Sequence, residues 1–108
     1  MTARPVIPRE RAVRDIDEAL DHYVREGGVA VALGFIDALE RAYRHIASNP
    51  ASGSPRHALE LNLPGLRSWQ LERYPHLIFY LERNDHIDVW RVLHGARDVP
   101  ASMRDEIG

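Results

Sequence analysis

The sequence predicts an α+β domain in which an N-terminal helical hairpin packs on a small antiparallel sheet of three to four strands. Over the first half of the chain, apolar residues recur at three- and four-residue steps, the period of an amphipathic helix. Three short runs of β-branched, aromatic and aliphatic residues then follow, separated by links of three residues. A chain of 108 residues supports one modest core, so we expect a single domain over residues 1–108.

The chain begins with an extended segment and a first helix. Because Pro5 and Pro8 disfavour the helical region for the residues before them, Arg4 to Ile7 is predicted to form a brief edge strand, a fourth strand for the sheet. From Arg9 the apolar positions follow a helical period for about four turns. The Gly27-Gly28 pair is predicted to end this helix, because glycine readily takes the positive φ of a helix C-terminus.

A second helical period begins at Val29 and ends before Asn49-Pro50. So short a break between two long helices predicts an antiparallel helical hairpin. The two helices cannot bury their apolar stripes alone, so a further layer must cover them. The glycines and prolines of Ala51 to Gly65 predict an ordered loop.

Three strands are predicted after this loop, at Leu66 to Glu72, His76 to Glu82 and His86 to Leu93. Their short links predict consecutive antiparallel hairpins. In the third run, strict alternation places Arg91 in one row with three apolar residues, Ile87, Val89 and Leu93. After Gly95 the chain becomes polar and its apolar residues, Met103 and Ile107, are too sparse to predict an element.

Composition excludes several kinds of site. The formal net charge is −2 and the charges are interspersed, which argues against specific nucleic-acid binding. Cysteine is absent, and the six histidines include no pair at metal-ligating spacing, so we expect neither a metal nor a cofactor. The chain shows neither a secretory leader nor a membrane-spanning run of apolar residues, so we expect a cytoplasmic protein.

Several phrases resemble the ParE branch of the ParE/RelE toxin superfamily of type II toxin–antitoxin systems. They are Ala38-Leu39-Glu40 through Asn49-Pro50, Leu63-Pro64-Gly65-Leu66-Arg67, His76-Leu77-Ile78-Phe79-Tyr80, and Val89-Trp90-Arg91-Val92-Leu93-His94-Gly95-Ala96-Arg97-Asp98. The resemblance covers roughly Arg9 to Pro100, and the last phrase is its most specific part. It implies a toxin neutralised by a cognate ParD-like antitoxin whose C-terminal segment wraps around it. The ParE branch inhibits DNA gyrase, whereas the RelE branch cleaves messenger RNA on the ribosome.

The residues expected of a ribonuclease of the RelE kind are incomplete in this sequence. That branch uses Lys and Arg side chains and often a Tyr near the C-terminus, but this chain has no lysine and no tyrosine after Arg97. A substitute catalytic set can be assembled from four residues, namely Arg67, Arg91, His94 and Arg97, since Arg binds phosphate and His serves as a general base. We favour the simpler interpretation, in which a partly buried Arg91 pairs with a carboxylate such as Asp88, Glu72 or Glu82. The strand aromatics Trp69, Trp90, Phe79, Tyr80 and Tyr74 are likewise predicted to fill the core and not to stack RNA bases.

The resemblance and the missing ribonuclease residues together imply a toxin that acts by protein–protein contact on DNA gyrase. Two alternatives stay open: a ribosome-dependent messenger-RNA endonuclease, and an inactivated toxin-like domain that only binds an antitoxin. We expect the antitoxin to occupy the helical hairpin and an open sheet edge, which is a template for strand addition. The residues predicted to contact it are Leu33, Ile36 and Tyr43 on the second helix and Arg67 on the sheet, where arginines would pair with acidic antitoxin side chains.

Overall fold

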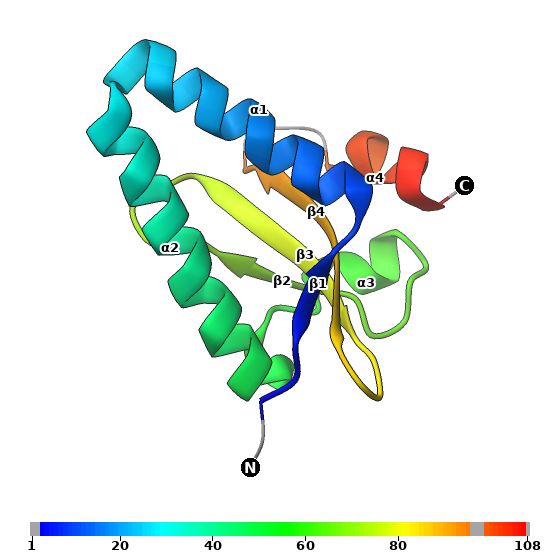
Figure 1. The fold of residues 1–108 in the computed structure, drawn as a ribbon. Coiled ribbons are helices and arrows are strands. Elements are labelled where there is room, and N and C mark those ends of the chain that lie inside the picture. The colour runs from blue at the N-terminus through cyan, green and yellow to red at the C-terminus, as the bar shows by residue number, and fades with distance from the viewer. Residues whose placement is uncertain (1–2, 96–98, 108) are drawn as a thin grey trace.

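The structure, a computed structural model, describes residues 3–95 and 99–107 and contains the predicted hairpin and strands (Figure 1). The elements in chain order are β1 (Val6–Pro8), α1 (Glu10–Gly27), α2 (Val29–Ser48), the 3-10 helix η1 (Pro50–Ser52), α3 (Arg56–Glu60), β2 (Arg67–Gln70), β3 (His76–Glu82), β4 (Ile87–His94) and α4 (Val99–Ile107). Gly28 separates the two long helices with a φ of 86°, as the Gly-Gly pair predicted. No helix of the described residues combines the length and the apolar character needed to cross a membrane.

The sheet has the order β1-β4-β3-β2. The predicted meander is confirmed, because β2 pairs with β3 and β3 with β4 in antiparallel register. The N-terminal strand also joins the sheet, but it begins at Val6 and not at Arg4, and it runs parallel to β4. The two long helices separate β1 from the other strands in sequence, so a sheet expected to be wholly antiparallel is mixed.

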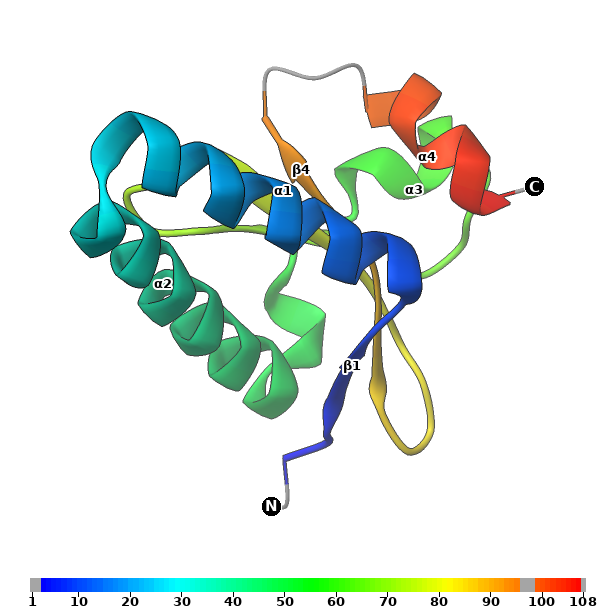
Figure 2. The ribbon, with the colours of Figure 1, turned by 45° about the horizontal axis from the view of Figure 1, so that its top comes forward.

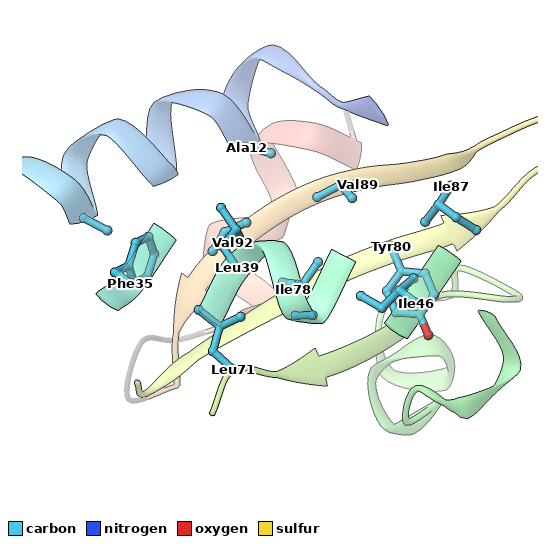
Figure 3. Packing of buried hydrophobic residues seen from close by; sticks show 12 residues of the cluster. Ala12, Phe35, Leu39, Ile46, Leu71, Ile78, Tyr80, Ile87, Val89 and Val92 are labelled. Atoms are coloured by element: carbon cyan, nitrogen blue, oxygen red, sulfur yellow. The ribbon is translucent and has the colours of Figure 1, made fainter. Parts of the chain in front are cut away.

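Helices cover both faces of the sheet (Figures 1 and 2). The hairpin of α1 and α2 closes the larger core, in which Phe35, Leu39 and Ile46 of α2 share one cluster with Ile78 and Val89 of the sheet (Figure 3). The sheet is therefore the covering layer that the two amphipathic helices require.

The other face of the sheet carries a second cluster, to which α4 contributes. The described residues in it are Leu66, Phe79, Trp90, Leu93, Val99 and Met103. The absence of an element after Gly95 was therefore predicted wrongly. Val99 and Met103 are spaced four residues apart and are both buried, so even two apolar residues anchor a helix where the sheet offers a hydrophobic surface.

A β-bulge breaks the alternation expected in β4. Phe79 lies opposite Arg91 but Tyr80 lies opposite Val89, which leaves Trp90 as the extra residue. The predicted single row of Ile87, Val89, Arg91 and Leu93 is wrong, because Val89 belongs to the larger core and Leu93 to the second one. One extra residue shifts every later side chain to the opposite face.

The predicted loop from Ala51 to Gly65 is ordered but includes most of η1 and all of α3. The Tyr80 hydroxyl holds it in place, since it donates to the carbonyl of Pro50 (2.8 Å) and accepts from the N–H of Gly53 (3.1 Å). These two hydrogen bonds satisfy backbone groups that the loop cannot satisfy itself.

Candidate functional site

The outer surface of the helical hairpin exposes apolar side chains. Leu33 is 54% exposed and Val29 is 64% exposed, on one side of α2. Val13 and Val24 are also exposed and lie on one side of α1, since eleven residues make about three turns. Val24 and Val29 lie four residues before and one residue after Gly28, so both belong to the end of the hairpin where α1 and α2 join. We call Val13, Val24, Val29 and Leu33 the hairpin stripe.

The residues predicted to bind an antitoxin differ in burial. Leu33 belongs to the hairpin stripe, whereas Ile36 and Tyr43 are half-buried. Tyr43 packs against the larger core, and its hydroxyl oxygen is buried with no hydrogen-bond partner among the described residues. Burial raises the pKa of Tyr43 to about 12. A ligand on this side of α2 would therefore meet Leu33 before it met the other two.

Both edges of the sheet offer few backbone groups for strand addition. At the β1 edge, Pro5 and Pro8 have no N–H to donate. At the β2 edge, Ser54 exchanges two backbone hydrogen bonds with Ser68, of 2.8 and 2.9 Å. The hairpin stripe is thus the more accessible of the two surfaces expected to receive a partner.

Arg67 is half-buried at the start of β2, and its Nη1 donates to the carbonyl of Gly53 at 2.8 Å. This contact holds the ordered loop against the sheet. Arg67 still exposes part of its surface, and the partner contact predicted for it stays a prediction.

Arg91 forms a buried ion pair with Asp15 of α1. Its Nε lies 2.7 Å from Asp15 Oδ2 and its Nη2 lies 2.8 Å from Oδ1, and only 1% of the Arg91 residue is exposed. Asp15 also accepts from the N–H of Val92, while Arg91 donates to the carbonyl of Ser102 in α4. A carboxylate partner was expected, but Asp88, Glu72 and Glu82 were the wrong residues. Contacts 76 positions apart in the chain cannot be found by spacing alone.

The candidate catalytic residues do not converge in the part of the chain that the structure describes. Arg67 lies opposite Tyr80, whereas His94 lies opposite His76 at the other end of β3. His76 and Tyr80 are four positions apart in β3, which is about 13 Å along a strand. Arg97 lies outside the described residues. The side chains that the structure describes also contain no group of three or more histidine, aspartate and glutamate residues able to hold a metal ion.

Asp88 is the centre of a network that the sequence did not predict. It accepts hydrogen bonds from both Arg9 and Arg83 and from the indole N–H of Trp90 at 3.0 Å. Arg9 in turn stacks on the Trp90 ring at 4.0 Å. Burial raises the pKa of Asp88, but these hydrogen bonds outweigh it and hold the pKa below its ordinary value.

Comparisons with known proteins give one family and one fold. The family model described as the ParE toxin of the type II toxin–antitoxin system parDE matches residues 6–99. Among solved structures, the chromosomal ParDE toxin–antitoxin system from P. aeruginosa contains a chain of similar fold. The match has a TM-score of 0.70 and 23% sequence identity, and covers 85% of this chain and 96% of that one. No curated protein matches the sequence.

Proposed function

The chain belongs to the ParE toxin family of type II toxin–antitoxin systems, and from this premise we propose that it is a non-catalytic toxin that inhibits DNA gyrase by protein–protein contact. We propose further that a ParD-like antitoxin neutralises it by covering the helical hairpin. Its place of action is then the cytoplasm, where gyrase and the antitoxin are found. The observation that carries the proposal is the hairpin stripe on a chain of this family.

The stripe supports a docking role because apolar side chains on a hairpin can be buried by a partner. Burying one exposed leucine contributes roughly 1 to 2 kcal/mol. The four apolar residues of the hairpin stripe therefore supply a good part of the affinity that a partner segment needs to order itself.

The arginine geometry favours contact over catalysis. Phosphoryl chemistry needs a general base and a charge stabiliser in one pocket. Arg91 is instead neutralised by Asp15, and Arg67 and His94 lie at opposite ends of the sheet. No described observation favours the ribonuclease alternative.

Induced expression of the toxin alone in bacteria tests the mode of action. Gyrase inhibition predicts filamentous cells and induction of the DNA-damage response, with protein synthesis continuing at first. An arrest of translation within minutes, with cleaved messenger RNA, would instead identify a ribonuclease. Normal growth together with retained antitoxin binding would identify an inactivated domain.

Substitution of Leu33 tests the antitoxin surface. We expect Leu33→Ser to weaken antitoxin binding about tenfold, since it removes one half-exposed apolar contact. Leu59→Ser is the matched control, because Leu59 is 92% exposed on α3, away from the hairpin. Equal affinities of the two variants, measured by calorimetry with the antitoxin encoded beside the toxin, would remove the stripe from the interface.

A further inference from the structure

One hollow of the molecule is not used by the function proposed above. It has a volume of about 470 Å³ and lies between α1 and the ends of β3 and β4. We call it the histidine hollow, and its described lining residues are Asp15, Glu18, Ala19, His22, Tyr23, His76, Val92 and His94.

Aromatic rings form a continuous wall along this hollow. The centroid of the Tyr23 ring lies 5.3 Å from that of His22 and 6.0 Å from that of His76. The His76 ring lies 5.4 Å from that of His94. All three contacts are edge-on, and His76 is buried while His22 and His94 are exposed. A flat ligand group can therefore lie against ring faces and edges without entering the core.

The two carboxylates of the hollow differ in their partners. Asp15 is neutralised by its bidentate pair with Arg91 and adds no net charge. Glu18 is exposed on α1 and makes no ion pair or hydrogen bond within the described residues. One uncompensated negative charge thus stands beside an aromatic wall. This combination suits a cation that offers both a charge and a flat surface.

We propose that the histidine hollow binds an arginine side chain supplied by the antitoxin. A guanidinium group stacks on aromatic rings and pairs with a carboxylate through two N–H groups, whereas the described residues provide no metal-binding group. The occupant rests on the proposed function, since the antitoxin is the partner expected to wrap this fold. The hollow adds a charged contact on α1 to the apolar contacts of the hairpin stripe.

A small probe tests the chemistry of the hollow on the toxin alone. N-acetyl-L-arginine amide, titrated to concentrations on the order of millimolar, is expected to shift the NMR signals of the His22, Tyr23 and His94 rings in a saturable way. The corresponding citrulline amide has the same shape without the charge and is expected to leave them in place.

Two variants test the role of Glu18. We expect Glu18→Gln to lose the response to the arginine amide and Glu40→Gln to keep it. Glu40 is a matched control because it is exposed on α2 with no partner among the described residues. Equal responses to arginine and citrulline amides, or none to either, would overturn the proposal.

Antitoxin binding tests whether an arginine of the antitoxin occupies the histidine hollow. Glu18→Gln is expected to weaken the antitoxin complex about fivefold, the loss of one partly exposed charged hydrogen-bond pair, while Glu60→Gln, at an exposed position on α3 away from the hairpin, leaves it unchanged. If both variants bind as the wild type does, the hollow receives no antitoxin arginine, and the proposed toxin function still stands. If the wild-type chain binds no antitoxin at all, the proposed function fails, and the antitoxin as occupant fails with it. The probe titration then tests by itself whether the histidine hollow binds a guanidinium group.

Discussion

At the scale of single residues, the Asp15–Arg91 pair connects α1, β4 and α4 in the interior. Removing one partner from a buried pair leaves the other charge uncompensated, which costs about 3 to 5 kcal/mol. We therefore expect Asp15→Asn to lower the free energy of unfolding by that amount in urea titrations. The double variant Asp15→Leu/Arg91→Met is expected to recover most of the loss. A double variant less stable than Asp15→Asn would show that the charges themselves stabilise the fold.

Gly53 has no room for a methyl group. A Cβ atom built there would overlap the Tyr80 hydroxyl and approach the Cβ of Arg67 at 3.0 Å. Gly53→Ala is expected to cost about 1 to 3 kcal/mol, measured as a lower Tm. Because the clash is mainly with the hydroxyl oxygen, the double variant Gly53→Ala/Tyr80→Phe is expected to lose less than the sum of the two single losses. Additive losses would contradict this geometry.

The hydrogen bonds to Asp88 predict a pH dependence of stability. Its pKa is lowered in the folded protein, so its contribution is complete above the unfolded-state pKa of about 3.9 and is lost as the pH falls through the lower folded value. The stability difference between wild type and Asp88→Asn is therefore expected to shrink from pH 7 to pH 3. Asp17→Asn, at an exposed position on α1, is the control and should show a nearly constant difference. A constant difference for Asp88→Asn as well would contradict the assignment.

At the scale of elements, the long helices and the strands β3 and β4 were predictable within a residue or two. Their apolar periods extend over many residues, and short links leave one pairing for consecutive strands. Three features could not be predicted from the sequence because they depend on tertiary contacts. The bulge at Trp90 follows from how β3 and β4 pair, the parallel register of β1 from its place beside β4, and α4 from a sheet face that its few apolar residues can cover. Among the residues predicted to contact the antitoxin, Leu33 is exposed, whereas Tyr43 is half-buried with a buried hydroxyl group. The helical period does not reveal such a difference in burial.

Met103 tests whether α4 belongs to the fold. Its side chain is fully buried in the second cluster, so Met103→Ala is expected to lower the free energy of unfolding by about 2 to 4 kcal/mol. Met103→Leu keeps the volume and is expected to cost less than about 1.5 kcal/mol. Equal and small effects of both substitutions in denaturant titrations would show that α4 is dispensable for stability.

At the scale of the whole molecule, helices cover both faces of the sheet. The exposed apolar side chains lie chiefly on the helical hairpin. The edges of the sheet offer few free backbone groups because of Pro5, Pro8 and the Ser54–Ser68 bridge, and three arginines, Arg9, Arg67 and Arg91, are held in structural contacts. These features support the docking role proposed above. The histidine hollow extends this docking surface along α1 by a site of different chemistry.

The most direct measurement is the supercoiling of relaxed plasmid by purified DNA gyrase in the presence of increasing amounts of the purified toxin. We expect supercoiling to be inhibited in proportion to the toxin and to be restored when the antitoxin reaches equal molar amounts. We also expect Leu33→Ser to keep its inhibition in the presence of antitoxin concentrations that silence the wild type. Undiminished supercoiling at a large molar excess of folded toxin would contradict the account.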